Sequence, residues 1–332
     1  MTAQQPLFRG GRAFPLRAAG SAAILSLLAA CGGGGGGDSG TPVQPGGSSL
    51  SISAANYQQV AQVAVSSAGY LLDTGDFAFG EQPGGATIAS PGGRLVTIQQ
   101  VRPAAVTSDT VNCTQGGSLL FSFNDLNSNA SWDVGDSLSA EARNCREDGL
   151  TLQGKLGLNA KALSGTFGGS SYSATLQLTL SDFSVTEGSD TAIGNGSIDM
   201  QVGVAAGTAE LTLVVDSLAL TGTEAGQPFS HSLREARLSL RLPAAGGSTS
   251  STSATVSSNR LDNKSVRIET ASPFVTAANA QFPSSGQLLI TGANGSKLRL
   301  TAQNGTQALL ELDADGDGSY ETRSTKNWSE LQ

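Results

Sequence analysis

Apolar and polar side chains alternate with a period of two over most of the chain after residue 93. The clearest runs are Leu156/Leu158, Leu176/Leu178/Leu180, Ile198/Met200/Val202/Val204, Leu211/Leu213/Val215 and Leu238/Leu240/Leu242. Because successive side chains of a strand point to opposite faces, these runs predict antiparallel strands with one apolar and one polar face. Roughly a dozen to fifteen strands follow one another at intervals of about ten residues. The pattern therefore predicts a mainly β fold: one large antiparallel sheet, a sandwich or a curved half-barrel.

One segment before these strands has the period of a helix. Apolar residues recur at helical spacing, namely Tyr57, Val60, Ala61, Ala64 and Ala68. Ser53 is a suitable N-cap, and the run Asp73-Thr74-Gly75-Asp76 is a suitable stop. We expect one N-terminal helix over Ser53–Leu72.

Turn signals divide the C-terminal third. Asn294-Gly295 and Asn304-Gly305 favour the positive φ angles of tight hairpin turns, and apolar alternation flanks both pairs. The Ser/Thr/Gly-rich stretch at 246–253 interrupts the pattern, and we interpret it as a long surface loop. A linker between two domains, with a sub-boundary near 244–254, is the alternative.

The first thirty residues have the pattern of an export signal. Met1–Arg17 is basic and lacks acidic residues, and Ala18–Ala30 is a short apolar run. Thirteen residues are too few for a membrane span, which needs about 20. We therefore expect 1–30 to be a signal peptide.

Leu28-Ala29-Ala30-Cys31 ends this run and resembles the lipobox of Gram-negative bacterial lipoproteins. The resemblance implies cleavage before Cys31 and attachment of fatty acyl chains, such as palmitate, to that cysteine. Several acyl chains anchor a protein stably, whereas one chain binds only marginally. An ordinary secretory signal with a chance cysteine is the alternative. Beyond residue 50 the chain resembles uncharacterised β-rich lipoproteins only in layout.

Gly32 follows the cysteine where the lipoprotein sorting pattern has aspartate for inner-membrane retention. The resemblance thus implies the outer membrane, on its periplasmic side or at the cell surface. The Gly-rich stretch of 31–50 would form a flexible tether with a reach of roughly 25 Å. We expect the β-rich globular domain to occupy 51–332.

Two cysteines remain once Cys31 carries lipid. Cys113 and Cys145 then form an even pair in an oxidising compartment, which predicts a disulfide. Its loop would contribute roughly 3–4 kcal/mol in the chain-entropy model.

The net charge of the chain limits the classes of molecule that it can bind. The net charge is −8, and removal of the leader makes it more negative because the leader holds Arg9, Arg12 and Arg17. An acidic body argues against nucleic acid as the partner. The membrane is contacted through the lipid, whereas the protein, glycan or hydrophobic ligand of the body stays unidentified.

A twelve-residue loop after residue 124 has oxygen-bearing side chains at calcium-loop spacing. The candidate ligands are Asp125, Asn127, Asn129, Asp133 and Asp136. Carboxylate and amide oxygens at this spacing can wrap one Ca²⁺, and the loop resembles those of EF-hands and dockerins. Ala130 stands where those loops have glycine, and the flanks indicate strands rather than helices.

A second stretch carries Asp313, Asp315, Asp317 and Glu321. It has Gly318 at the sixth position but Ser324 at the twelfth, so the bidentate carboxylate is missing. Turn formation by Asn, Asp and Gly is the alternative explanation for both loops. Any calcium would be structural.

Enzyme signatures are missing. His231 is the single histidine, and we expect it at the surface rather than as a general base. No nucleophile elbow, zinc-protease, Walker or dinucleotide motif occurs. We therefore expect a non-enzymatic, lipid-anchored binding or structural module of the cell envelope. The alternatives are a carrier that holds a hydrophobic ligand in a curved β-sheet, as in periplasmic lipoprotein-handling folds, and a secreted hydrolase that uses paired carboxylates.

Overall fold

The computed structural model describes residues 48–79, 87–89, 95–97, 107–129, 131–147, 149–166, 170–224, 226–278 and 280–331. The chain divides into two compact units, Met1–Pro42 and Val43–Gln332, and every described residue belongs to the second. The predicted signal peptide, Cys31 and nearly all of the predicted tether lie outside the described residues.

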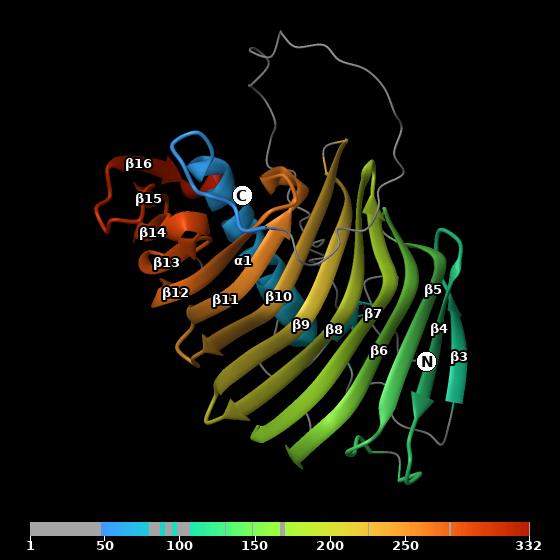
Figure 1. Cartoon of the computed structure of the whole chain (residues 1–332). Coiled ribbons are helices and arrows are strands. Elements are labelled where there is room, and N and C mark those ends of the chain that lie inside the picture. Colours follow the sequence, from blue (N-terminus) through green and yellow to red (C-terminus); the bar gives the residue numbers. More distant parts are fainter. Residues whose placement is uncertain are drawn as a thin grey trace, which may run out of the picture. The chain divides into compact units, whose positions relative to one another are not determined.

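One antiparallel sheet dominates the second unit (Figure 1). Within the described residues its fourteen strands are β3 (Thr107–Asn112), β4 (Ser118–Asn124), β5 (Ser137–Glu147), β6 (Leu150–Gly165), β7 (Tyr172–Glu187), β8 (Asp190–Ala205), β9 (Thr208–Glu224), β10 (Gln227–Leu242), β11 (Ser248–Ser258), β12 (Ser265–Thr276), β13 (Ser285–Thr291), β14 (Lys297–Asn304), β15 (Gln307–Asp313) and β16 (Thr322–Asn327). They lie side by side in chain order, and β3 and β16 form the two edges. The predicted mainly β class with a large antiparallel sheet is confirmed.

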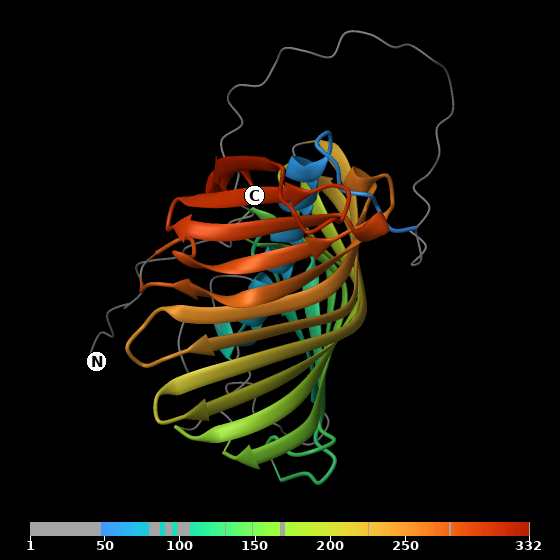
Figure 2. The same ribbon diagram turned by 60° about the vertical axis from the view of Figure 1, so that its left-hand side comes forward.

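The sheet is strongly curved, as Figure 2 shows. Backbone bulges with positive φ interrupt three of the long strands, at Asn144 in β5, Asp182 in β7 and Glu235 in β10. Each bulge adds a residue to one strand and bends it. At Gly154 an ideal Cβ would lie 2.1 Å from the carbonyl oxygen of Asp182, so only glycine fits there.

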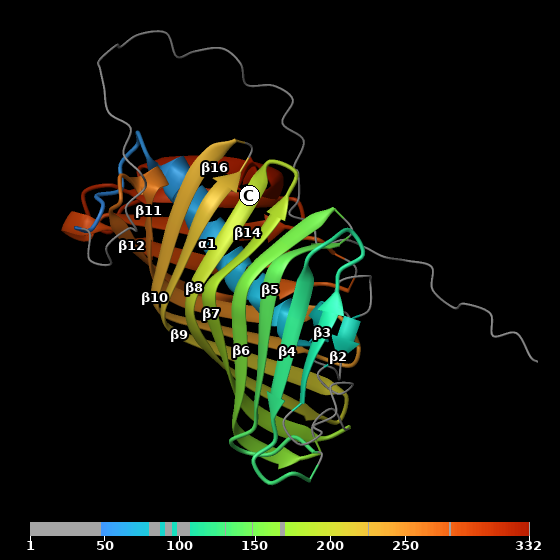
Figure 3. The ribbon, with the colours of Figure 1, turned by 90° about the vertical axis from the view of Figure 1, so that its right-hand side faces the viewer.

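Helix α1 (Tyr57–Phe79) lies along the hollow side of this sheet (Figure 3). It buries one face, formed by Tyr57, Val60, Ala61, Val63, Ala64, Ser67 and Leu71. The apolar residues of this face pack in one core with the inward residues of the strands. The helix begins four residues after the predicted start and continues through Gly75. A single glycine costs only about 1 kcal/mol in a helix, which is too little to end it here.

Smaller elements complete the unit. A separate pair of strands, β1 (Thr87–Ala89) and β2 (Leu95–Thr97), is antiparallel. Three short 3₁₀ helices are η1 (Asn259–Leu261), η2 (Ala293–Gly295) and η3 (Trp328–Glu330). Both predicted Asn-Gly turns connect paired strands, and Asn294 and Gly295 have the expected positive φ angles.

The Ser/Thr-rich stretch is not the surface loop that the sequence suggested. Residues 248–258 form strand β11 and pair with both β10 and β12. Ala254 and Val256 supply buried inward side chains, and serine and threonine fill the positions between them. A strand needs an apolar residue only at every second position, so the polar composition concealed it.

The predicted disulfide is present. Cys113 and Cys145 are joined, with their Cα atoms 5.4 Å apart. Cys113 lies just after β3 and Cys145 lies in β5, so the bridge fixes the β3–β4 turn to the neighbouring strand. Both residues are buried in a small cluster with Leu119 and Ala142.

Candidate metal centre

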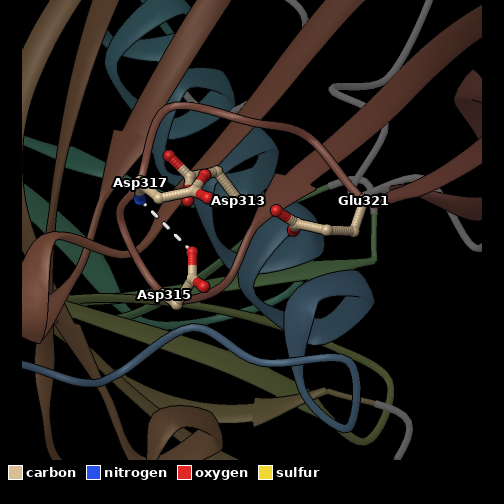
Figure 4. Close-up of side chains that lie close together, drawn as sticks. All are labelled: Asp313, Asp315, Asp317 and Glu321. Atoms are coloured by element: carbon tan, nitrogen blue, oxygen red, sulfur yellow. Dashed lines mark hydrogen bonds between the residues drawn. The ribbon is translucent and has the colours of Figure 1, made fainter.

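The connection from β15 to β16 brings four acidic side chains together (Figure 4). Asp313 ends β15 and is fully buried, while Asp315, Asp317 and Glu321 are exposed. One ligand atom from each residue lies within 4.8 Å of the others. This acidic loop, residues 313–321, could hold a metal ion.

Hydrogen bonds from the backbone shape the acidic loop. The carboxylate of Asp313 accepts the amides of Gly316 (2.7 Å) and Gly318 (3.1 Å). Asp315 accepts the amide of Asp317, and Asp317 that of Ser319. These are the two-residue side-chain turns that aspartate forms readily. They curl the backbone so that the carboxylates face one another.

Two glycines permit this path. Gly316 and Gly318 have φ angles of +78° and +95°, a region that other residues adopt at a cost. An ideal Cβ on Gly316 would lie 2.9 Å from backbone atoms of Gly295, so the acidic loop rests directly on the β13–β14 turn.

Two arginine side chains beside the acidic loop contact the neighbouring Glu311. Arg299 lies 4.1 Å from the ring centre of Tyr320 and also contacts Glu311 at 2.7 Å. Arg323 contacts the other oxygen of Glu311 at 3.2 Å. Both arginines thus form ion pairs with Glu311, which is not one of the four acidic side chains of the loop. Four carboxylates with no nitrogen or sulfur donor favour a hard ion such as Ca²⁺ or Mg²⁺.

The other predicted calcium loop, between β4 and β5, closes on itself. Asp136 is fully buried and accepts the amides of Leu126 (3.0 Å) and Asp133 (2.8 Å). The exposed carboxylate of Asp133 accepts the side-chain NH₂ groups of Asn127 and Asn129. These two hydrogen bonds lower the pKa of Asp133. Donors therefore occupy both oxygens of Asp136 and Oδ2 of Asp133.

The two asparagines of this loop also form hydrogen bonds within it. Their side-chain oxygens accept the backbone amides of Asn129 and Ser131. Asp125 is buried and directly follows β4, whereas Asp313 is the last residue of β15. Over the described part of the chain, the acidic loop is the one place where three or more acidic, histidine or cysteine side chains converge in this way.

The structure corrects the expected position of His231. Its side chain is 2% exposed, points inward from β10 and lies 5.5 Å from the ring of Phe229. Burial, with a smaller effect of Arg260, lowers its pKa to about 4. The sequence signal was present, because Phe229, His231 and Leu233 share one face of an alternating strand.

Comparisons with protein-family models, with curated proteins and with solved structures each found no match to this chain. Among the helices that the structure describes, none combines the length and apolar character that a membrane span needs.

Proposed function

We propose that this chain is a lipid-anchored, non-enzymatic module of the bacterial outer membrane, on the periplasmic side or at the cell surface. The lipobox Leu28-Ala29-Ala30-Cys31 carries the proposal. The β-rich body then acts as the binding or structural part.

Lipid attachment is tested on the full chain in a Gram-negative host. We expect wild type in the membrane fraction, with an N-terminal peptide whose mass shows acylated Cys31. Cys31→Ser should lose the acyl mass and leave the outer membrane. The double variant Cys113→Ala/Cys145→Ala is the control and should keep the lipid. An unmodified Cys31 in membrane-bound wild type would refute the proposal.

We propose further that the acidic loop holds a structural Ca²⁺. Calcium accepts six to eight oxygen ligands in flexible geometry, whereas Mg²⁺ requires a tighter octahedron. A wide loop with four carboxylates suits calcium better. Saturation at 100 times the dissociation constant would add about 2.7 kcal/mol to the free energy of unfolding.

Calorimetry and thermal unfolding in EDTA, Ca²⁺ or Mg²⁺ test the ion. Calcium should raise the melting temperature of wild type and have no effect on Asp315→Asn/Asp317→Asn. The matched control Asn127→Ala/Asn129→Ala, in the other loop, should keep the calcium response. Equal melting temperatures for wild type in all three conditions would sink the calcium site.

A carrier of a hydrophobic ligand is the second candidate, and one buried polar group of helix α1 supports it. The sheet is open, and its hollow side is lined by leucine, isoleucine and valine side chains under a helix with small residues. The buried hydroxyl of Ser67 in that helix makes no hydrogen bond to any described residue. A ligand with one polar group could use it. Native mass spectrometry of protein extracted from membranes should then show a noncovalent mass that organic solvent removes.

A further inference from the structure

The chain enters its folded body through a short segment, Ser48–Ile52, that we call the strap. Ser49 forms a parallel bridge with Ser265, the first residue of β12. The amide of Leu50 donates to the carbonyl of Ser265 at 2.8 Å, and the amide of Ser265 donates to the carbonyl of Ser48 at 3.2 Å. Strand β13 ends at Thr291, opposite Arg267, so the strap fills the place beside Ser265 that β13 leaves open.

The strap is also bound to the β13–β14 turn. The carbonyl of Leu50 accepts the amide of Ala293 at 2.8 Å, and the amide of Ile52 donates to Oγ of Ser296 at 2.9 Å. Leu50 and Ile52 are 6% and 0% exposed. The four hydrogen bonds and two buried side chains thus join the strap to the start of β12 and to the β13–β14 turn.

The strap and the β13–β14 turn are in close contact at Gly292. An ideal Cβ on Gly292 would lie 2.3 Å from the carbonyl oxygen of Leu50 and 2.8 Å from Cγ1 of Ile52. No side chain larger than hydrogen fits between the turn and the strap. The φ angle of Gly292 is −106°, so a substitution here acts through space and not through backbone strain.

Helix α1 begins only after the strap. Asn56 accepts the amide of Ser53 at 2.8 Å and donates to the carbonyl of Ser51 at 3.0 Å, which closes the turn before the helix. Any pull applied before Ser48 therefore reaches the strap first. The strap runs parallel to β12, so a pull away from this end of the sheet loads its hydrogen bonds together, in shear, and not one by one.

We infer that the strap is a mechanical clamp, which carries the pull of the N-terminal tether into β12 and the β13–β14 turn and so shields helix α1. The inference rests on the proposed function in one respect, since the tether to Cys31 supplies the pull. The clamp explains why a short segment without regular secondary structure fits so tightly against the start of β12 and the β13–β14 turn.

Single-molecule force spectroscopy on the chain from residue 32 onward tests the clamp without any lipid. One handle is attached at the N-terminus and the other at Val275→Cys, an exposed position near the far end of β12. Wild type should show a first rupture at high force. Gly292→Ala should lose this event, so that the helix detaches at lower force.

Gly305→Ala is the matched control, because its Cβ would meet only one atom, at an ordinary 3.8 Å. It should keep the first rupture of wild type. Ser296→Ala removes the hydrogen bond that Ser296 Oγ accepts from Ile52 and the one it donates to the carbonyl of Ala293. It should lower the rupture force without abolishing the event and replaces Gly292→Ala if that variant does not fold. Equal rupture forces in wild type and the strap variants would overturn the clamp, whatever Cys31 carries.

Discussion

The β4–β5 loop and the acidic loop contain similar residues but use them in different ways. Each has a buried aspartate at or directly after the end of the preceding strand, Asp313 or Asp125, and both form side-chain turns. Carboxylates of both loops accept backbone amides, but Asp133 of the β4–β5 loop also binds two asparagine side chains, whereas in the acidic loop four carboxylates converge within 4.8 Å. Oxygen spacing along the sequence therefore does not define a metal site; whether the folded backbone brings the carboxylates together decides it.

The largest expected effect comes from the buried carboxylate that closes each loop. Asp136→Ala and Asp313→Ala each leave two backbone amides without an acceptor, and we expect each to lower the free energy of unfolding by about 4 kcal/mol. Urea titration in EDTA measures both. Added calcium should then stabilise Asp136→Ala but not Asp313→Ala. An equal gain in both variants would contradict the difference between the loops.

The pH dependence of stability due to the two loops can be compared only in a variant without His231, because this histidine also changes its charge as the pH falls. Its pKa of about 4 in the folded state lies below the usual 6.5, so the unfolded chain binds the extra proton as the pH falls. The stability from neutral His231 is complete above pH 6.5, and about 3 kcal/mol should be lost between pH 6.5 and 4.

Urea midpoints across this pH range check the prediction. His231→Gln should show a shallower loss of stability, and the remaining slope belongs to carboxyl groups. The matched control Gln227→Ala changes an exposed residue at the start of the same strand. A wild-type slope that persists in His231→Gln would show that the histidine is not the main proton acceptor.

The two loop glycines should differ by a smaller amount. Gly316→Ala combines an unfavourable φ with contact to Gly295 and should cost about 3 kcal/mol, whereas Gly318→Ala meets only the φ penalty of about 1 kcal/mol. Thermal unfolding in EDTA measures the pair. A cost for Gly318→Ala as large as that of Gly316→Ala would mean that the acidic loop does not rest on the β13–β14 turn.

The smallest effect concerns Asp133. Hydrogen bonds from Asn127 and Asn129 lower its pKa, so this carboxylate should stay charged to a lower pH than an ordinary aspartate and lose its hydrogen bonds only in stronger acid. Carboxyl NMR titration should show the pKa rise in Asn127→Ala/Asn129→Ala. An unchanged pKa would mean that the loop does not close in solution.

Sequence reasoning found most of the sheet because alternation is local. It also located the acidic loop through Asp313, Asp315 and Gly318. It could not separate the two loops, since the β4–β5 loop has the fuller spacing and its side-chain contacts depend on the folded path of the backbone. Ala130 in place of glycine was a local sign against it. Strand β11 and buried His231 were missed because polar residue types outweighed their position in an alternating pattern.

The chain-order arrangement of the strands has a consequence for assembly. From β3 to β16, each strand pairs only with its neighbours in sequence, so the sheet can grow hairpin by hairpin with little loop-closure entropy at each step. Helix α1 is the exception, because it is synthesised before the sheet yet packs against β9, β10, β11 and β14. Its docking must wait until most of the protein exists. The first helix of the described residues is therefore one of the last elements to reach its final position.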